Sequence, residues 1–223
     1  LLYGVTLRDE LVCIDVKSGQ VSWTFSTRPD RHDLVPSAPA AGEYVFFGDR
    51  DGALYALHPV TGKIVWKRDL GVPLSTSLVL SGDHIYLGAA NHIYRVNRRT
   101  GTIDGELLVD GWTFGRPAIA GDSLLIFIGS TLSSLDLSLG GIRWRQKTNG
   151  KWRTPRLHIW GDAVLAGNEL GEVYAFRISD GDKQWSHDFE GIIRSIGNSQ
   201  RVLYVGTRQG KVYAYISGQG SKP

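Results

Sequence analysis

The fold is decided by residues 54–66, LYALHPVTGKIVW, in which an apolar strand pattern leads to Gly62 and a tryptophan, Trp66, follows four residues later. This arrangement recurs at intervals of 43, 39, 39 and 41 residues, with turn glycines at Gly19, Gly62, Gly101, Gly140 and Gly181. Four copies carry the tryptophan at the same offset, namely Trp23, Trp66, Trp144 and Trp185, whereas the third copy has Gly105. The chain has seven tryptophans in 223 residues, so this coincidence indicates an internal repeat. A sixth copy starts at Val212-Tyr213-Ala214-Tyr215.

The strand before each turn glycine has apolar residues eight and five positions upstream of the glycine. Six positions upstream the residue is small, as in Cys13, Ala56, Ser134 and Ala175, with Arg95 as the exception. Adjacent strand residues point to opposite faces, so apolar groups on both faces indicate a strand covered by a sheet on each side. The small residue is expected where the next sheet approaches closely.

Each copy contains four strand-like segments and no helical pattern. Tight turns join the second and third segments at Asp51-Gly52, Ala90-Asn91, Leu170-Gly171 and Gln209-Gly210. The sequence therefore predicts an all-β fold, a β-propeller of four-stranded blades with about six repeat units, either incomplete or part of a larger ring. We expect a single domain over residues 1–223, with units near 1–30, 31–72, 73–110, 111–150, 151–190 and 191–223.

The first unit lacks an inner strand and the last lacks an outer one. Three interpretations remain: a loose six-bladed ring, a fragment of a larger ring, or a ring completed by another chain. Open strand edges would pair with a strand of a partner or of a second copy, so β-strand addition by a partner and self-association are the binding modes expected there.

Composition excludes several classes of protein. Hydrophobic residues make up 42% and charged residues 21% of the chain, which is typical of an ordered globular domain. The net charge of +3 comes from scattered residues and does not favour nucleic acid as a partner. No apolar run approaches the length of about 18 residues that a membrane span needs. The lone Cys13 cannot form an internal disulfide and leaves the compartment open.

The segments Leu54-Tyr55-Ala56-Leu57 and Thr61-Gly62-Lys63-Ile64-Val65-Trp66 resemble the pyrroloquinoline-quinone-type repeat, which covers essentially the whole chain. The resemblance implies that the tryptophan of each blade docks on the backbone near the next blade's turn glycine, and that this docking is weak or absent at Gly105. The family includes quinoprotein dehydrogenases, the periplasmic lipoprotein scaffold of the outer-membrane assembly machine, and sensor domains of receptors and kinases. The repeat implies only the fold, so function depends on a site.

No catalytic, cofactor or metal site is expected. The adjacent Cys-Cys pair of many quinoprotein dehydrogenases is absent, and Asp49 and Asp51 lie on a predicted hairpin turn without the other ligands of a calcium loop. The histidines lack metal-ligand spacing, although His84 and His92 flank one predicted strand pair. Ser195 and His187 belong to no nucleophile motif. We therefore expect a protein that is not an enzyme.

Basic and aromatic residues lead into the predicted inner strands of the later units, near the mouth of a central channel. Arginine and tryptophan are favoured in protein-binding surfaces, so we hypothesise a partner-binding rim there. The alternative is a solvated mouth with Trp152 and Trp160 packed within a blade. The candidate residues are Trp112, Arg116, Lys151, Trp152, Arg153, Arg156 and Arg194, with Phe114 beside them.

The interpretation favoured by the sequence is a non-catalytic scaffold that presents its rims and strand edges to a protein partner. The resemblance adds outer-membrane protein assembly as the process and the periplasm, or another extracytoplasmic space, as the location. A quinone-dependent dehydrogenase and an extracellular or lumenal sensor domain are the alternatives.

Overall fold

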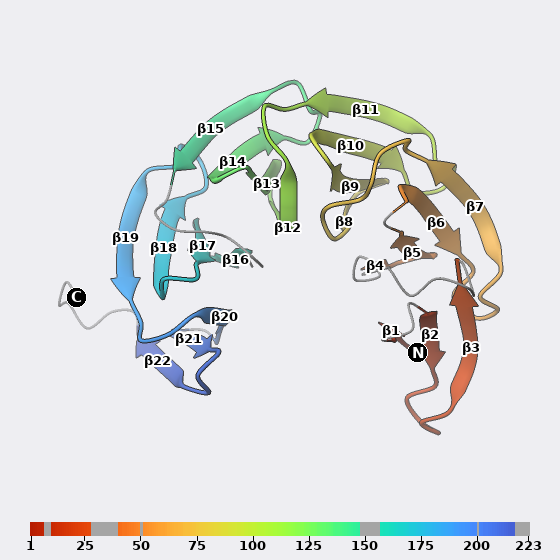
Figure 1. The fold of residues 1–223 in the computed structure, drawn as a ribbon, viewed down its shortest axis with the longest axis horizontal. Coiled ribbons are helices and arrows are strands. Elements are labelled where there is room, and N and C mark those ends of the chain that lie inside the picture. The colour runs from red at the N-terminus through yellow and green to blue at the C-terminus, as the bar shows by residue number, and fades with distance from the viewer. Residues whose placement is uncertain (7–9, 28–39, 50, 148–156, 200, 217–223) are drawn as a thin grey trace. The chain divides into compact units, whose positions relative to one another are not determined.

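A computed structural model describes residues 1–6, 10–27, 40–49, 51–147, 157–199 and 201–216, and strands make up all of its regular secondary structure. These residues form six antiparallel sheets in which consecutive strands pair (Figure 1). The chain divides into two compact units, Leu1–Thr113 and Phe114–Pro223. The all-β propeller class expected from the repeat is confirmed, while the expectation of a single domain stays a prediction.

The first unit contains three sheets. The first consists of β1 (Leu2–Val5), β2 (Glu10–Ile14) and β3 (Val21–Ser26). The second consists of β4 (Ala40–Ala41), β5 (Val45–Gly48), β6 (Ala53–Leu57) and β7 (Ile64–Asp69). The third consists of β8 (Val79–Ser81), β9 (His84–Ala89), β10 (His92–Asn97) and β11 (Ile103–Leu108).

The second unit also contains three sheets, and β12 begins at the boundary residue. The fourth sheet consists of β12 (Thr113–Ala120), β13 (Ser123–Ile128), β14 (Thr131–Asp136) and β15 (Ile142–Lys147). The fifth consists of β16 (Leu157–Trp160), β17 (Ala163–Gly167), β18 (Glu172–Arg177) and β19 (Lys183–Asp188). The sixth consists of β20 (Ile193–Asn198), β21 (Val202–Thr207) and β22 (Val212–Ile216).

In the second, fourth and fifth sheets the third strand is buried on both faces, as its pattern predicts, whereas β22 of the sixth sheet alternates between exposed and half-buried residues. All five residues of β6 are buried, whereas β7 alternates between exposed and half-buried residues because it lies at the edge of its sheet. The predicted hairpin turns form, with left-handed backbone at Gly52, Ala90, Gly171 and Gly210. In each of the first five sheets the register with the outer strand shifts directly after the residue six positions before the turn glycine, as between Ala56 and Leu57.

Apolar cores lie between consecutive sheets within each unit. In the first unit, Phe46 and Leu54 of the second sheet pack with Ile85 and Leu87 of the third. Equivalent clusters join the first and second sheets, the fourth and fifth, and the fifth and sixth. Stability therefore comes from contacts between neighbouring sheets, as in repeat proteins. No helix of membrane-spanning length and hydrophobicity occurs in the described part of the chain.

Candidate functional site

The repeated tryptophans connect consecutive sheets through their ring nitrogens. The Nε1–H of Trp23 donates to the carbonyl of Pro59 at 3.0 Å, and that of Trp66 to the carbonyl of Arg98 at 3.0 Å. In the second unit, Trp144 donates to the carbonyl of Ile178 at 2.8 Å. The ring of Trp185 stacks on Tyr215 with centroids 6.2 Å apart, and the turn it would meet, at Gly220, lies outside the described residues.

Each docked indole lies directly against the next turn glycine. A Cβ atom at Gly101 would lie 2.7 Å from Trp66, and one at Gly181 would lie 2.6 Å from Trp144. Both glycines also have left-handed backbone, with φ of +69° and +80°. Any side chain would collide with the indole and strain the backbone, so these positions require glycine.

The third repeat replaces the docking pair with a polar one. Arg95 of β10 lies directly opposite Gly105 of β11, at the positions where the second sheet pairs Ala56 with Trp66. The Arg95 Nε donates to Asp104 Oδ1 at 2.9 Å, and its Nη2 donates to the Asp104 carbonyl at 2.8 Å. Arg95 replaces the usual small residue and Gly105 replaces the usual tryptophan, and the structure pairs these two exceptions with each other. Their occurrence in the same repeat was the signal in the sequence that could have indicated the pairing.

Asp104 is the centre of this polar cluster. His84 Nε2 lies 2.8 Å from its Oδ2, beside the bonds from Arg95. Partial burial opposes ionisation of the carboxyl group, but the hydrogen bonds from Arg95 and His84 outweigh burial and lower the pKa of Asp104 below its ordinary value. The carboxylate is therefore charged at neutral pH and holds the outer two strands together.

The turn of the fourth repeat differs from the others. Leu139 takes the left-handed backbone, with φ of +61°, and its N–H donates to the Asp136 carbonyl at 3.1 Å. A Cβ atom at Gly140 would meet only Asp136 and Ser138, at ordinary contact distances from 3.4 Å. The third repeat, which has Gly105 in place of the tryptophan, directly precedes this fourth repeat in the chain. The repeat without a tryptophan is therefore followed by a turn at which Gly140 is not required.

The hypothesised rim is only partly described. Arg116 on β12 and Arg194 on β20 are exposed on the first strands of their sheets in the second unit. Trp112, at the end of the first unit, is 64% exposed. Phe114 and Trp160 are half-buried and pack against apolar cores of the second unit, so they are not free for a partner. Lys151, Trp152, Arg153 and Arg156 lie outside the described residues.

The acidic and histidine candidates have structural roles. Asp49 is buried, and its carboxylate accepts the Ala53 N–H at 2.8 Å and the Tyr55 hydroxyl at 3.2 Å across the β5–β6 hairpin. His92 Nδ1 lies 2.8 Å from Glu106, and His158 bonds Asn198 at 2.6 Å. Within the described ranges, no three His, Cys, Asp or Glu residues lie together as a metal site would require.

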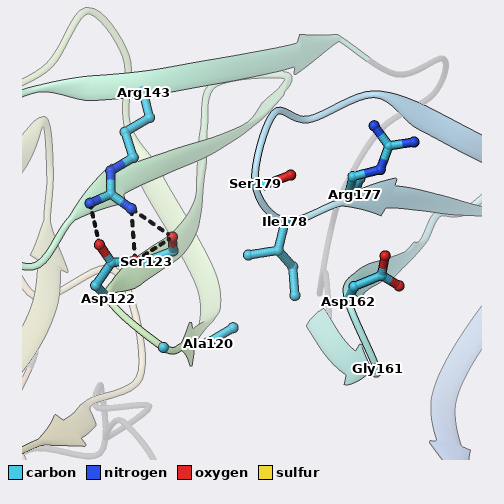
Figure 2. A pocket seen from close by; sticks show the side chains of 10 residues that line it. Ala120, Asp122, Ser123, Arg143, Gly161, Asp162, Arg177, Ile178 and Ser179 are labelled. Atoms are coloured by element: carbon cyan, nitrogen blue, oxygen red, sulfur yellow. Dashed lines mark hydrogen bonds and ion pairs between the residues drawn. The ribbon is translucent and has the colours of Figure 1, made fainter.

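A cavity of about 510 Å³ lies in the second unit, between the fourth and fifth sheets, and no pattern in the sequence indicated it. Three turns and the outer strand β15 form its walls, and Ile178 projects into the space between them (Figure 2). Arg143 holds both oxygens of Asp122, at 2.9 and 2.7 Å, and donates to the Ser123 hydroxyl at 3.0 Å. The lining residues are Ala120, Gly121, Asp122, Ser123, Arg143, Gly161, Asp162, Arg177, Ile178 and Ser179.

Comparison with known proteins gives matches along nearly the whole chain. Residues 7–222 match the family described as "Outer membrane protein assembly factor BamB". The BamB of Yersinia pestis is 28% identical over 165 residues, which cover 65% of this chain and 41% of that protein. The crystal structure of BamB from Moraxella catarrhalis superposes with a TM-score of 0.72 at 17% identity, over 95% of this chain and 72% of that one, which shows the shared fold.

A second group of relatives matches a shorter part. The quinoprotein ethanol dehydrogenase of Pseudomonas aeruginosa is 36% identical over 76 residues, which cover 30% of this chain and 12% of that enzyme. The chain thus spans less than half the length of the curated relatives it matches.

Proposed function

Because this chain belongs to the family of the outer membrane protein assembly factor BamB, we propose that it is a non-catalytic scaffold that binds protein partners in outer-membrane protein assembly. The observation that carries the proposal is the extent of the match, residues 7–222, against the 30% of the chain that resembles a dehydrogenase. The periplasm is the corresponding location.

The contact surfaces we propose are the exposed arginines and the strand edges. Arg116 and Arg194 present their guanidinium groups on the first strands of two sheets, where they can bind carboxylates of a partner in bidentate fashion. Among the described residues β22 pairs only with β21, and Val212 and Ile216 on it are 74% and 59% exposed. Such an edge offers backbone hydrogen bonds to a strand of a partner or of a second copy.

Crosslinking in a cell-envelope extract, followed by identification of the captured proteins, tests the function. We expect outer-membrane assembly proteins to be captured, and we expect the double variant Arg116→Glu with Arg194→Glu to reduce their capture. Arg201→Glu, at an exposed arginine directly before β21, is the matched control. Unchanged capture by the folded double variant would remove the arginines from the interface, and capture of unrelated proteins alone would overturn the assembly role.

The partial dehydrogenase match gives the competing function, which a direct assay addresses. With pyrroloquinoline quinone and Ca²⁺ added, we expect no cofactor absorption to remain after gel filtration and no turnover of ethanol with an artificial electron acceptor. Retention of the chromophore together with turnover would establish an enzyme in place of a scaffold.

A further inference from the structure

We propose that the cavity between the fourth and fifth sheets binds a lysine or arginine side chain of a protein segment, with Asp162 as the counter-ion. Its walls come from the turns Gly121–Asp122 and Gly161–Asp162, from the turn after β18, and from β15 (Figure 2). The inference goes beyond the proposed function, because it concerns the ligand class of a separate cavity and holds whether or not the chain acts in outer-membrane assembly.

The two arginines that line the cavity are already paired with carboxylates. Arg143 forms its two bonds to Asp122, while Arg177 Nη1 lies 2.8 Å from Asp180 and 3.6 Å from Asp182. An anionic ligand would have to compete with these carboxylates for the guanidinium groups.

Asp162 lines the same cavity, and in the described part of the chain its side chain has no hydrogen bond or ion pair. The lining residues and the ion-pair partners of Arg177 therefore carry four carboxylates, on Asp122, Asp162, Asp180 and Asp182, against two guanidinium groups. The local excess is negative in a chain whose net charge is +3, which favours a cationic ligand.

Comparison between repeats shows why Asp162 is distinctive. Each of four repeats has an acidic residue directly after a glycine at the turn between its first two strands. At this position Glu43 lies 3.7 Å from Arg99, Asp83 lies 3.7 Å from Arg98, and Asp122 lies 2.7 Å from Arg143. Among the described residues, Asp162 is the member of this set that forms no close ion pair: it interacts with Arg177 only at longer range, and Arg177 is already paired with Asp180 and Asp182. A basic side chain from outside would supply that ion pair.

The rest of the lining suits a long basic side chain. Ile178 and Ala120 provide apolar surface for its methylene groups, which lysine and arginine commonly bury while their charged end stays polar. The hydroxyl groups of Ser123 and Ser179 can accept hydrogen bonds from an ammonium or guanidinium group. A volume of about 510 Å³ accommodates such a side chain together with part of its backbone.

The test is a titration of the full chain, labelled with ¹⁵N, with the peptides acetyl-Gly-Arg-Gly-amide and acetyl-Gly-Lys-Gly-amide. We expect saturable shifts of the amide signals of Gly121, Gly161 and Ser179, and weaker binding as salt is added. Asp162→Asn should weaken binding about three- to fivefold, as expected for a contact that solvent reaches. Asp188→Asn, on β19 and outside the lining, should leave binding unchanged.

Several outcomes would overturn the inference. Equal shifts with acetyl-Gly-Glu-Gly-amide, equal affinity of Asp162→Asn and the unmodified chain, or no saturable shift at these amides would each do so. Since Asp162 is exposed, the Asn variant should fold, and its unperturbed spectrum elsewhere verifies this. The readout is independent of partner capture, so the inference and the proposed function can fail separately.

Discussion

The second and third sheets place their one large side chain on opposite strands of the same cross-strand pair. In the second sheet, small Ala56 lies opposite large Trp66, and the indole reaches forward to the carbonyl of Arg98. In the third sheet, large Arg95 lies opposite Gly105, and its guanidinium group turns to Asp104 on its own sheet. The backbone register is the same, so one large side chain per cross-strand pair fills the space, and its identity decides whether the sheet bonds to its neighbour or to itself.

The turns that follow show the consequence. Gly101 receives the indole of Trp66 and has left-handed backbone, whereas at the fourth repeat Leu139 takes the left-handed position and Gly140 does not. The glycine requirement therefore comes from the docked indole as well as from the turn.

The largest expected effect comes from Gly101→Ala. The new Cβ would lie 2.7 Å from Trp66 on left-handed backbone, so we expect a loss of about 3–5 kcal/mol from strain and overpacking together. Denaturant unfolding monitored by tryptophan fluorescence measures it.

Two controls separate the causes of that loss. Gly82→Ala has left-handed backbone, with φ of +53°, and no neighbour within 4 Å, so it should cost about 1 kcal/mol from backbone strain alone. Gly140→Ala should be nearly neutral. Equal losses at Gly101 and Gly140 would break the comparison between the two turns.

The second largest effect is expected for Trp66→Ala, with a loss of about 2–4 kcal/mol in the free energy of unfolding, because the half-buried indole packs on Phe46 and contacts the next turn. Trp66→Phe keeps a ring but removes the bond to Arg98, so it should lose only about 1–2 kcal/mol. Thermal unfolding of both variants gives the two losses, and an equal loss would mean that the N–H alone matters.

Replacing Arg95 and Gly105 of the third sheet by the Ala–Trp pair of the second sheet tests the comparison directly. Gly105→Trp alone should destabilise by about 1–3 kcal/mol, because a Cβ there already lies 3.1 Å from the Cβ of Arg95. Adding Arg95→Ala should recover part of that loss, giving a favourable coupling of about 1 kcal/mol in a double-mutant cycle. Additive losses would show that the two positions do not share one space.

The smallest expected effect is on pH dependence. Since the pKa of Asp104 is lowered in the folded chain, its stabilisation is complete above the unfolded value of about 4 and is lost as pH falls through the folded value. Asp104→Asn should therefore lose less stability than the unmodified chain on acidification from pH 5 to pH 3. The measurement is the free energy of unfolding of both proteins at each pH. An equal loss of that free energy between pH 5 and pH 3 in both proteins would contradict this role for Asp104.

The sequence by itself determined the repeat, the strand order within each sheet and the positions of the tryptophans and turn glycines. These features follow from local periodicity, since alternation along a strand and a fixed offset to the tryptophan are visible without any distant residue. For the binding rim, the sequence could only nominate candidate residues by their type and position. It could not show which contacts those residues make.

Only the tertiary structure decided which side chains meet. It placed Arg95 opposite Gly105, let Leu139 take the left-handed turn position, and left Asp162 without a close ion pair among the described residues, in a cavity between two sheets. The first and the last of these depend on residues distant in the sequence that share a space through strand register or sheet packing. No local sequence pattern specifies which distant residues come together, because their contacts depend on how side chains of neighbouring strands and sheets pack.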